Sequence, residues 1–425
     1  MNTPSLTELQ SHFQAVASTV ARGLSEGNSH VVALVAKWEK RDLVPGLSDL
    51  DFRVICDDQT SADDWIAIDR LAGQVHLEMV RAHPEWNRIN EHTPGAGMTI
   101  SEVLDSRFSN PEYAVWSLWW GRRDWFDRLK ARMVARRFDA ADERYHLSKF
   151  LQYYSPYIHG IDPPINLGAL EPKYAMHSRC WHYFAPPMLS AAAILARKNF
   201  SGKWEALSWL RDNGLVTEQV DAVFQQLEAH YETPERTCAD RLHAFEELLF
   251  AGFKQLYPLL LESIEHLNVD RSTSPGQLKK RLEAASADPL ATLMEHIRYA
   301  RIRSGRYAFY LNAPSHFDAR RLLRYELNWI RKLTEPIVDS LRTLLGDPNL
   351  SHEQCFDRLG LTVDPTQHRA IDHLWNMAHQ APQDTALRDM FQEAVQLFPH
   401  YYRLIERALE IVRQDNEAHF GTPSS

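Results

Sequence analysis

The sequence predicts an α+β protein in which a small sheet near the N-terminus is followed by a large helical region. Two kinds of pattern predict this class. Short β-branched or alternating runs, typical of strands, fall within residues 30–80. Apolar residues at helical spacing dominate from about residue 101 onward. The 425 residues, 44% of them hydrophobic, are enough for two or three domains with ordinary cores.

The first elements follow from local patterns. A capping box, Ser5-x-x-Glu8, starts a helix that its apolar spacing carries to about residue 25. Residues 30–38 are apolar and β-branched, which favours a buried strand. A polar turn leads to a second strand over residues 46–55, and a helix is expected over 61–72.

A third strand is expected over residues 74–80, where apolar and polar residues alternate. This alternation would place His76 and Glu78 on one face of the strand. His76 would then touch substrate or water, or simply hydrogen-bond a neighbour. Residues 81–112 are rich in proline and glycine and are expected to form a loop, either one that closes over a substrate or a plain surface connection.

The remainder is expected to be helical. Residues 113–138 interleave tryptophan with arginine, a pattern that suits nucleic-acid binding or an amphipathic helix with a solvated basic face. The arginines within residues 298–306 are also expected to form a solvated face. Further helices are expected over residues 139–154, 174–210, 242–261, 290–299, 322–345 and 390–412.

The stretch that indicates chemistry is Gly46-Leu-Ser-Asp-Leu-Asp-Phe-Arg-Val-Ile55. In an extended strand, Asp49, Asp51 and Arg53 share one face, with the two carboxylates about 6–7 Å apart. Like charges at this spacing repel, and a divalent cation that prefers oxygen ligands, such as Mg²⁺, relieves the repulsion. An edge strand with solvated aspartates is the alternative.

These residues resemble the signature strand of the nucleotidyltransferase superfamily that includes DNA polymerase beta. The resemblance implies a small mixed sheet that holds two Mg²⁺ ions and a nucleoside triphosphate. It implies that Asp49 and Asp51 bind both ions. Glu78, on the expected third strand, would complete the coordination of the ion that activates the acceptor, or would act as the base.

The sequence departs from the family at one place. Where the family carries a Gly-Ser pair that contacts phosphates, this chain has Val35-Ala-Lys-Trp38. Lys37 could supply charge there, Gly46 and Ser48 could take over the contact, or the site could be impaired.

Residues 184–210 resemble the helical second domain of antibiotic-modifying nucleotidyltransferases. This resemblance implies that Lys203, at a helix start, reaches the triphosphate, although a surface lysine is an equal alternative. With Arg53 and Lys37, it would offset charge on the departing pyrophosphate. The expected domains are a catalytic domain over 1–112, a helical domain completing the cleft over 113–220 and a C-terminal helical domain over 221–425.

The composition and the missing motifs argue against several other classes of function. The net charge of −9 disfavours nonspecific duplex binding, and four scattered cysteines give no zinc or disulfide pattern. Walker, nucleophile-elbow and dinucleotide-binding motifs are missing from the sequence. Since neither a signal segment nor an apolar run of membrane-spanning length is visible, a cytoplasmic protein without membrane association is expected.

The sequence therefore predicts Mg²⁺-dependent transfer of a nucleoside monophosphate from an NTP to a small-molecule hydroxyl, phosphate or phosphonate. Two alternatives stay open. One is transfer to RNA or to a protein. The other is a catalytically weakened nucleotide-binding or helical interaction protein, suggested by the missing Gly-Ser pair.

Overall fold

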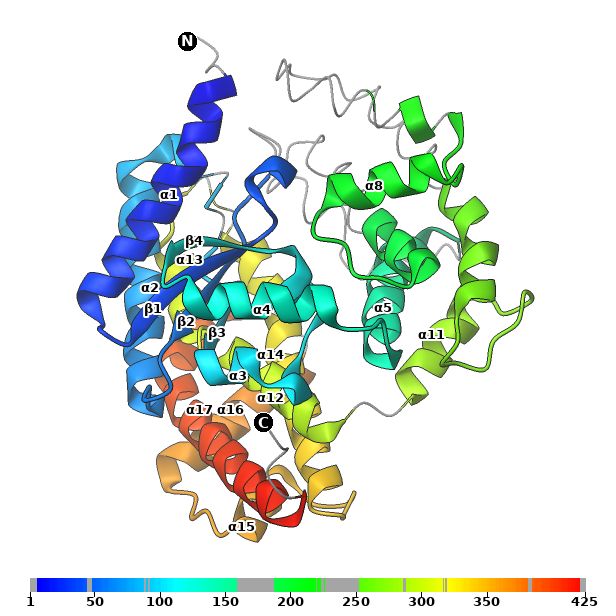
Figure 1. Ribbon diagram of the computed structural model, residues 1–425. Coiled ribbons are helices and arrows are strands. Elements are labelled where there is room, and N and C mark those ends of the chain that lie inside the picture. The colour runs from blue at the N-terminus through cyan, green and yellow to red at the C-terminus, as the bar shows by residue number, and fades with distance from the viewer. Residues whose placement is uncertain are drawn as a thin grey trace. The chain divides into compact units, whose positions relative to one another are not determined.

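The computed structural model confirms the α+β class, with a small mixed sheet near the N-terminus and a large helical region after it (Figure 1). The structure describes residues 6–43, 48–87, 89–90, 92–158, 187–218, 220–222, 225, 252–285, 288–315, 317, 319–380 and 384–420.

Four strands form the sheet in the order β3-β2-β1-β4. They are β1 (Val31–Lys37), β2 (Phe52–Cys56), β3 (Ala96–Thr99) and β4 (Trp116–Gly121). Strands β2 and β3 are parallel, and Arg53 lies opposite Ala96 in their register. All residues of β2 and β3 are buried. Because parallel neighbours start at the same edge of a sheet, the segments leading into β2 and β3 meet at that edge.

The expected first helix and first strand are confirmed by α1 (Leu6–Gly27) and β1. The second strand is shorter than expected, because regular pairing starts only at Phe52 and residues 48–51 are irregular. The next helix, α2 (Ala62–Ala82), begins at a capping box in which Ser61 and Asp64 exchange hydrogen bonds.

The expected strand over residues 74–80 is wrong, because these residues are the second half of α2. Its buried residues Ala72, His76, Met79 and Val80 follow the helical period of 3.6, which the apparent alternation concealed. No proline interrupts the helix before Pro84, so the helix that starts at Ser61 continues.

Two strands were not expected. β3 lies within the expected loop of residues 81–112 and is followed by the short helix α3 (Ile100–Leu104). β4 occupies the start of the expected helix over 113–138, and α4 (Asp124–Ala135) follows it. The tryptophans of β4 suit a strand, and Gly121 ends it with φ near 103°.

The chain divides into two compact units, each discontinuous in sequence. Unit 1 contains Met1–Val16, Ala36–Leu50 and Ser109–Ser286, with helices α4, α5 (Ala140–Ile158), α8 (Lys203–Asp212) and α11 (Pro275–Ala284). Unit 2 contains Ala17–Val35, Asp51–Phe108 and Ala287–Ser425. The expected contiguous domains over 1–112, 113–220 and 221–425 stay a prediction.

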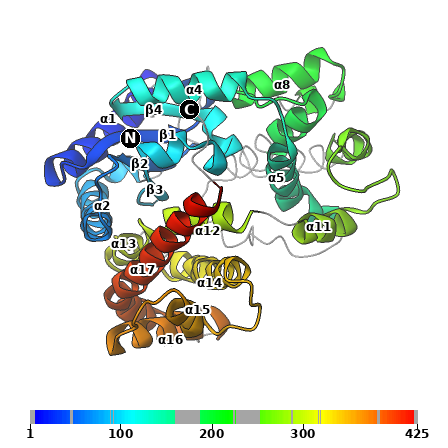
Figure 2. The same ribbon diagram turned by 60° about the horizontal axis from the view of Figure 1, so that its bottom comes forward.

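The C-terminal helices of unit 2 pack against one another (Figure 2). They are α12 (Pro289–Ala300), α13 (Ser304–Asn312), α14 (Ala319–Leu344), α15 (His352–Arg358), α16 (Pro365–His379) and α17 (Asp384–Phe420). The expected helices over 290–299, 322–345 and 390–412 are confirmed. Among the described helices, none has both the length and the apolar character that crossing a bilayer requires.

Within unit 2, α13 packs closely against α2. Gly73 and Gly305 allow this approach, since a Cβ on Gly73 would lie 2.5 Å from the carbonyl oxygen of Gly305. One helical turn further along each helix, the ring of His76 meets that of Phe309 edge to face. The two glycines therefore fix how near α13 lies to α2.

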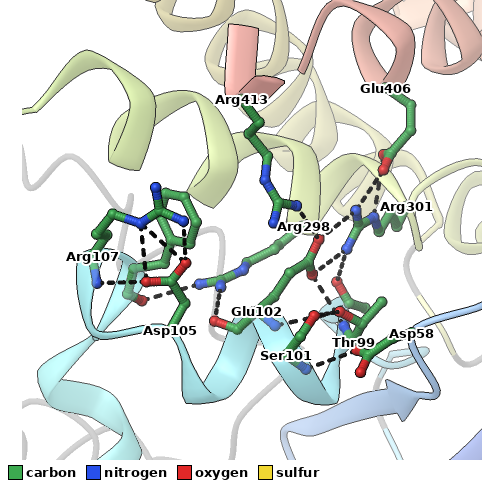
Figure 3. Close-up of polar contacts among 12 residues, drawn as sticks. Asp58, Thr99, Ser101, Glu102, Asp105, Arg107, Arg298, Arg301, Glu406 and Arg413 are labelled. Carbon is green, nitrogen blue, oxygen red and sulfur yellow. Dashed lines mark hydrogen bonds and ion pairs between the residues drawn. The ribbon is translucent and has the colours of Figure 1, made fainter. Parts of the chain in front are cut away.

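Charged side chains also join distant parts of unit 2 (Figure 3). Arg301 is 3% exposed and forms ion pairs of 2.6 Å with Glu102 after β3 and with Glu406 on α17. Burial raises the pKa of Glu102, but Arg301 and Arg298 outweigh this effect and lower it to about 2. Glu102 is therefore ionised, and its ion pair with Arg301 joins the segment after β3 to the C-terminal helices.

Candidate functional site

Asp49 and Asp51 lie in the irregular segment that leads into β2, both partly exposed. The alternation of a β-strand does not set the direction of these two side chains, because regular pairing begins only at Phe52. Arg53 instead fixes the segment: its Nη1 donates hydrogen bonds to the carbonyl oxygens of Asp51 and Phe52, at 3.2 and 3.1 Å. Arg53 thus binds the backbone that carries the acids.

Gly95 supports the same arrangement from the segment leading into β3. Its N–H donates to the carbonyl oxygen of Phe52 at 2.8 Å, and a Cβ on it would lie 3.2 Å from Nη1 of Arg53. A side chain at position 95 would therefore press on the guanidinium that holds the backbone of Asp51.

His92 is the third member of the group that contains Asp49 and Asp51. It lies four residues before β3, and its Nε2 is 3.0 Å from Oδ1 of Asp51. Its side chain is 9% exposed and that of Asp51 is 34% exposed. Ligand atoms of Asp49, Asp51 and His92 all lie within 4.8 Å of one another. The parallel pairing of β2 and β3 explains why segments forty residues apart converge here.

The hydrogen bonds of His92 define its role. Its Nδ1 lies 2.8 Å from the carbonyl oxygen of Thr93, which can only accept, so Nδ1 carries a proton. Nε2 is then the atom facing Asp51. Metal-binding histidines characteristically donate their second ring N–H to such a carbonyl, which fixes the tautomer and the ring orientation.

Two carboxylates and one imidazole fit a single divalent cation. Carboxylates suit Mg²⁺ and Mn²⁺, and an imidazole shifts the preference toward first-row transition ions. Among the described residues this is the one group of three such side chains close enough to share an ion. The ligands account for one ion, and the two Mg²⁺ ions that the family resemblance implies stay a prediction.

The structure does not bring Glu78 to this group. Glu78 lies on the exposed side of α2, where Gln74 Nε2 donates to its Oε1 at 2.9 Å. The expected strand would have aimed it at the acids, but the helix replaces that strand. His76, expected beside it, is buried and donates from Nδ1 to the carbonyl oxygen of Ala72 at 3.0 Å.

Two buried polar residues, His76 on α2 and Glu326 on α14, interact electrostatically with His92. Burial lowers the pKa of His76 to about 3, and His92 and Arg306 act in the same direction, so His76 is neutral. Glu326 on α14 is fully buried, and burial alone would raise its pKa. The positive charges of Arg306 and Arg303 outweigh this and lower its pKa, with a smaller contribution from His92. The C-terminal helices therefore supply a charge that interacts with His92.

The expected phosphate-binding residues of unit 1 have other contacts. Lys37 lies 3.8 Å from Glu112. Lys203 is buried rather than on the surface, with its Nζ 4.2 Å from the ring centre of Trp38 and 3.5 Å from the carbonyl oxygen of Asp42. Neither belongs to the aspartate group, and their roles stay predictions.

Two further expected residues precede the aspartates. Ser48 is buried at the start of the described segment, and Gly46 lies outside the described residues. A phosphate contact by either one stays a prediction.

The two arginine-rich stretches, within residues 113–138 and 298–306, differ in their exposure to solvent. Arg122 and Arg123, within residues 113–138, are exposed and pair with Asp124 and Asp127, as expected for a solvated basic face. The expectation of a solvated face is wrong for the second run, whose arginines are all buried: Arg298, Arg301, Arg303 and Arg306.

No family model matches the chain, and the searches of curated proteins and of solved structures likewise give no match. The resemblance at Ser48–Arg53 therefore rests on those residues alone. Sequence reasoning missed His92, although one signal was available. It lies in a proline- and glycine-rich segment just before the four-residue run that forms β3.

Proposed function

We propose that the chain is a divalent-cation-dependent nucleotidyltransferase whose cation is held by Asp49, Asp51 and His92. The observation that carries the proposal is the convergence of these three side chains at the edge where β2 and β3 begin. A bound divalent cation would neutralise the negative charge of a triphosphate and polarise its reacting phosphate.

The chain's own residues prepare this site. Arg53 and Gly95 hold the backbone of Asp51, and the carbonyl oxygen of Thr93 orients His92. The acceptor oxygen forms a bond to the α-phosphorus of an NTP while the bond to the β-phosphate oxygen breaks, releasing pyrophosphate and a proton. A small-molecule acceptor remains the proposed substrate, and RNA or protein acceptors are the alternatives.

The test measures pyrophosphate release from each NTP with Mg²⁺ and, separately, with Mn²⁺. We expect cation-dependent release that falls below detection in Asp49→Asn and Asp51→Asn, because each change removes a carboxylate charge from the cation. Glu78→Gln is the matched control and is expected to retain activity, since Glu78 lies outside the group. Full activity in both aspartate variants would refute the proposal.

One observation favours a second candidate function. Because Glu78 is not near the aspartates, the described group offers ligands for one cation, which suits a protein that binds nucleotide without turning it over. In that case an NTP with cation would raise the melting temperature while no pyrophosphate appeared.

A further inference from the structure

Arg306 is a buried arginine whose guanidinium uses only part of its hydrogen-bonding capacity within the described structure. It lies on α13, is 6% exposed, and donates from Nε to Oε1 of Glu326 at 2.8 Å. Its guanidinium carbon lies 5.6 Å from the ring centre of Tyr310. Among the described residues, Nη1 and Nη2 have no hydrogen-bond partner, although a guanidinium offers five donors.

The packing of unit 2 brings α13, which carries Arg306, against α2, which carries His76. Gly305, the preceding residue, lies against Gly73 of α2, and His76 on α2 meets Phe309 of α13. His76 in turn interacts electrostatically with both Arg306 and His92. Arg306 and His92 therefore both lie within electrostatic range of His76.

Charge supports the same placement. Burial alone would lower the pKa of Arg306. The negative charge of Glu326 raises it by more, with smaller contributions in the same direction from Tyr310, Tyr325 and Asp51, so the pKa is raised overall. Arg306 thus keeps its charge, and it lies within electrostatic range of Asp51. A fixed positive charge beside a cation site would repel the cation unless an anion joined both, which is what a phosphate group does.

We propose that Arg306 is the anion-contacting residue of this site and that its Nη edge binds a phosphate group of the substrate beside Asp51 and His92. This inference builds on the proposed cation site and adds a phosphate ligand from the C-terminal helices. Arginine suits the role because its planar fork matches two phosphate oxygens at once.

Arg303 provides a matched control. It donates from Nη1 to Oε2 of the same Glu326 at 2.8 Å and is also buried, but its guanidinium lies over the ring of Trp329, 4.4 Å from the ring centre. Losing either arginine therefore removes one partner of Glu326. Only the loss of Arg306 would remove the proposed phosphate contact.

The experiment measures pyrophosphate binding to the full chain by calorimetry, with and without Mn²⁺, for wild type, Arg306→Lys and Arg303→Lys. Lysine keeps the positive charge and N–H donors for Glu326 but lacks the planar fork of the guanidinium. We expect binding about tenfold weaker or more in Arg306→Lys, the loss of one charge-assisted bidentate contact, and nearly unchanged binding in Arg303→Lys. Mn²⁺ alone should bind equally to all three.

Wild-type binding of pyrophosphate in Arg306→Lys, equal losses in both variants, or no binding by wild type would each overturn the inference. Arg306→Gln replaces Arg306→Lys if the latter does not fold. The result also separates the two proposals. If pyrophosphate binding depends on Arg306 but NTPs yield no pyrophosphate, nucleotidyl transfer fails and the anion contact stands.

Discussion

His92 shows how much the candidate site depends on single side chains. Its Nδ1 is committed to the carbonyl oxygen of Thr93, so its Nε2 must face Asp51. Local sequence indicated the two aspartates, because the Asp-x-Asp pair leads into an apolar strand pattern and the whole stretch resembles a known signature strand. It did not indicate His92, because the contact depends on β3 pairing with β2, which no local pattern revealed.

Asp69 leads to a prediction at the same scale. It is fully buried on α2, and burial raises the pKa of its carboxyl to about 7 despite hydrogen bonds from Gly305 and Ser304. Because the folded pKa exceeds the ordinary value of 3.8, the folded state holds a proton that the unfolded state has lost between these values. Wild-type stability should therefore fall as pH rises from about 4 to about 7.

Asp69→Asn removes this titration while keeping an oxygen acceptor. Its stability relative to wild type should rise with pH over that window, by at most about 4 kcal/mol in total. Urea unfolding at pH 5 and pH 8 measures the change, with Asp63→Asn, an exposed aspartate on the same helix, as control. Identical pH dependence for Asp69→Asn and wild type would rule out a protonated Asp69.

At the scale of elements, the close packing of α2 and α13 is the central feature. A Cβ on Gly305 would overlap the backbone carbonyl of Asp69, which a rotamer change cannot relieve. Gly305→Ala should therefore destabilise the protein by roughly 1–3 kcal/mol, the usual cost of overpacking.

The control for this prediction is Gly276→Ala on α11, where a Cβ meets nothing within 4 Å. This change should leave stability unchanged or raise it by about 0.5–1 kcal/mol, because alanine loses less backbone entropy than glycine in a helix. Chemical denaturation of both variants gives the comparison. A Gly305→Ala protein as stable as Gly276→Ala would show that α13 can move away from α2 at little cost.

The same elements show where sequence patterns succeed. α1 and the C-terminal helices have long apolar periodicities, and β1 is a continuous apolar run, so that propensity and burial agree in each. Residues 74–80 misled because Val75, Leu77 and Met79 alternate within a helix whose real period appears only over a longer window. β3 has four residues, too few for any periodicity.

At the scale of the whole molecule, the C-terminal helices share a compact unit with Asp51 and His92 of the candidate site. Residues 287–425 belong to the same compact unit as β2, β3 and His92. Arg301 and Arg306 come from this region, and the first is tied to Glu102 beside β3. The sequence showed these arginines as a basic run, and only the three-dimensional packing shows that they are buried with acidic partners.

The central claim is that Asp49, Asp51 and His92 share one divalent cation. Pulsed electron paramagnetic resonance of Mn²⁺ bound to the full chain tests it most directly, because a coordinated imidazole nitrogen couples to the electron spin. The account predicts one Mn²⁺ per chain with a histidine-nitrogen coupling that disappears in His92→Gln and persists in Glu78→Gln. Bound Mn²⁺ without nitrogen coupling, or coupling unchanged in His92→Gln, would contradict it.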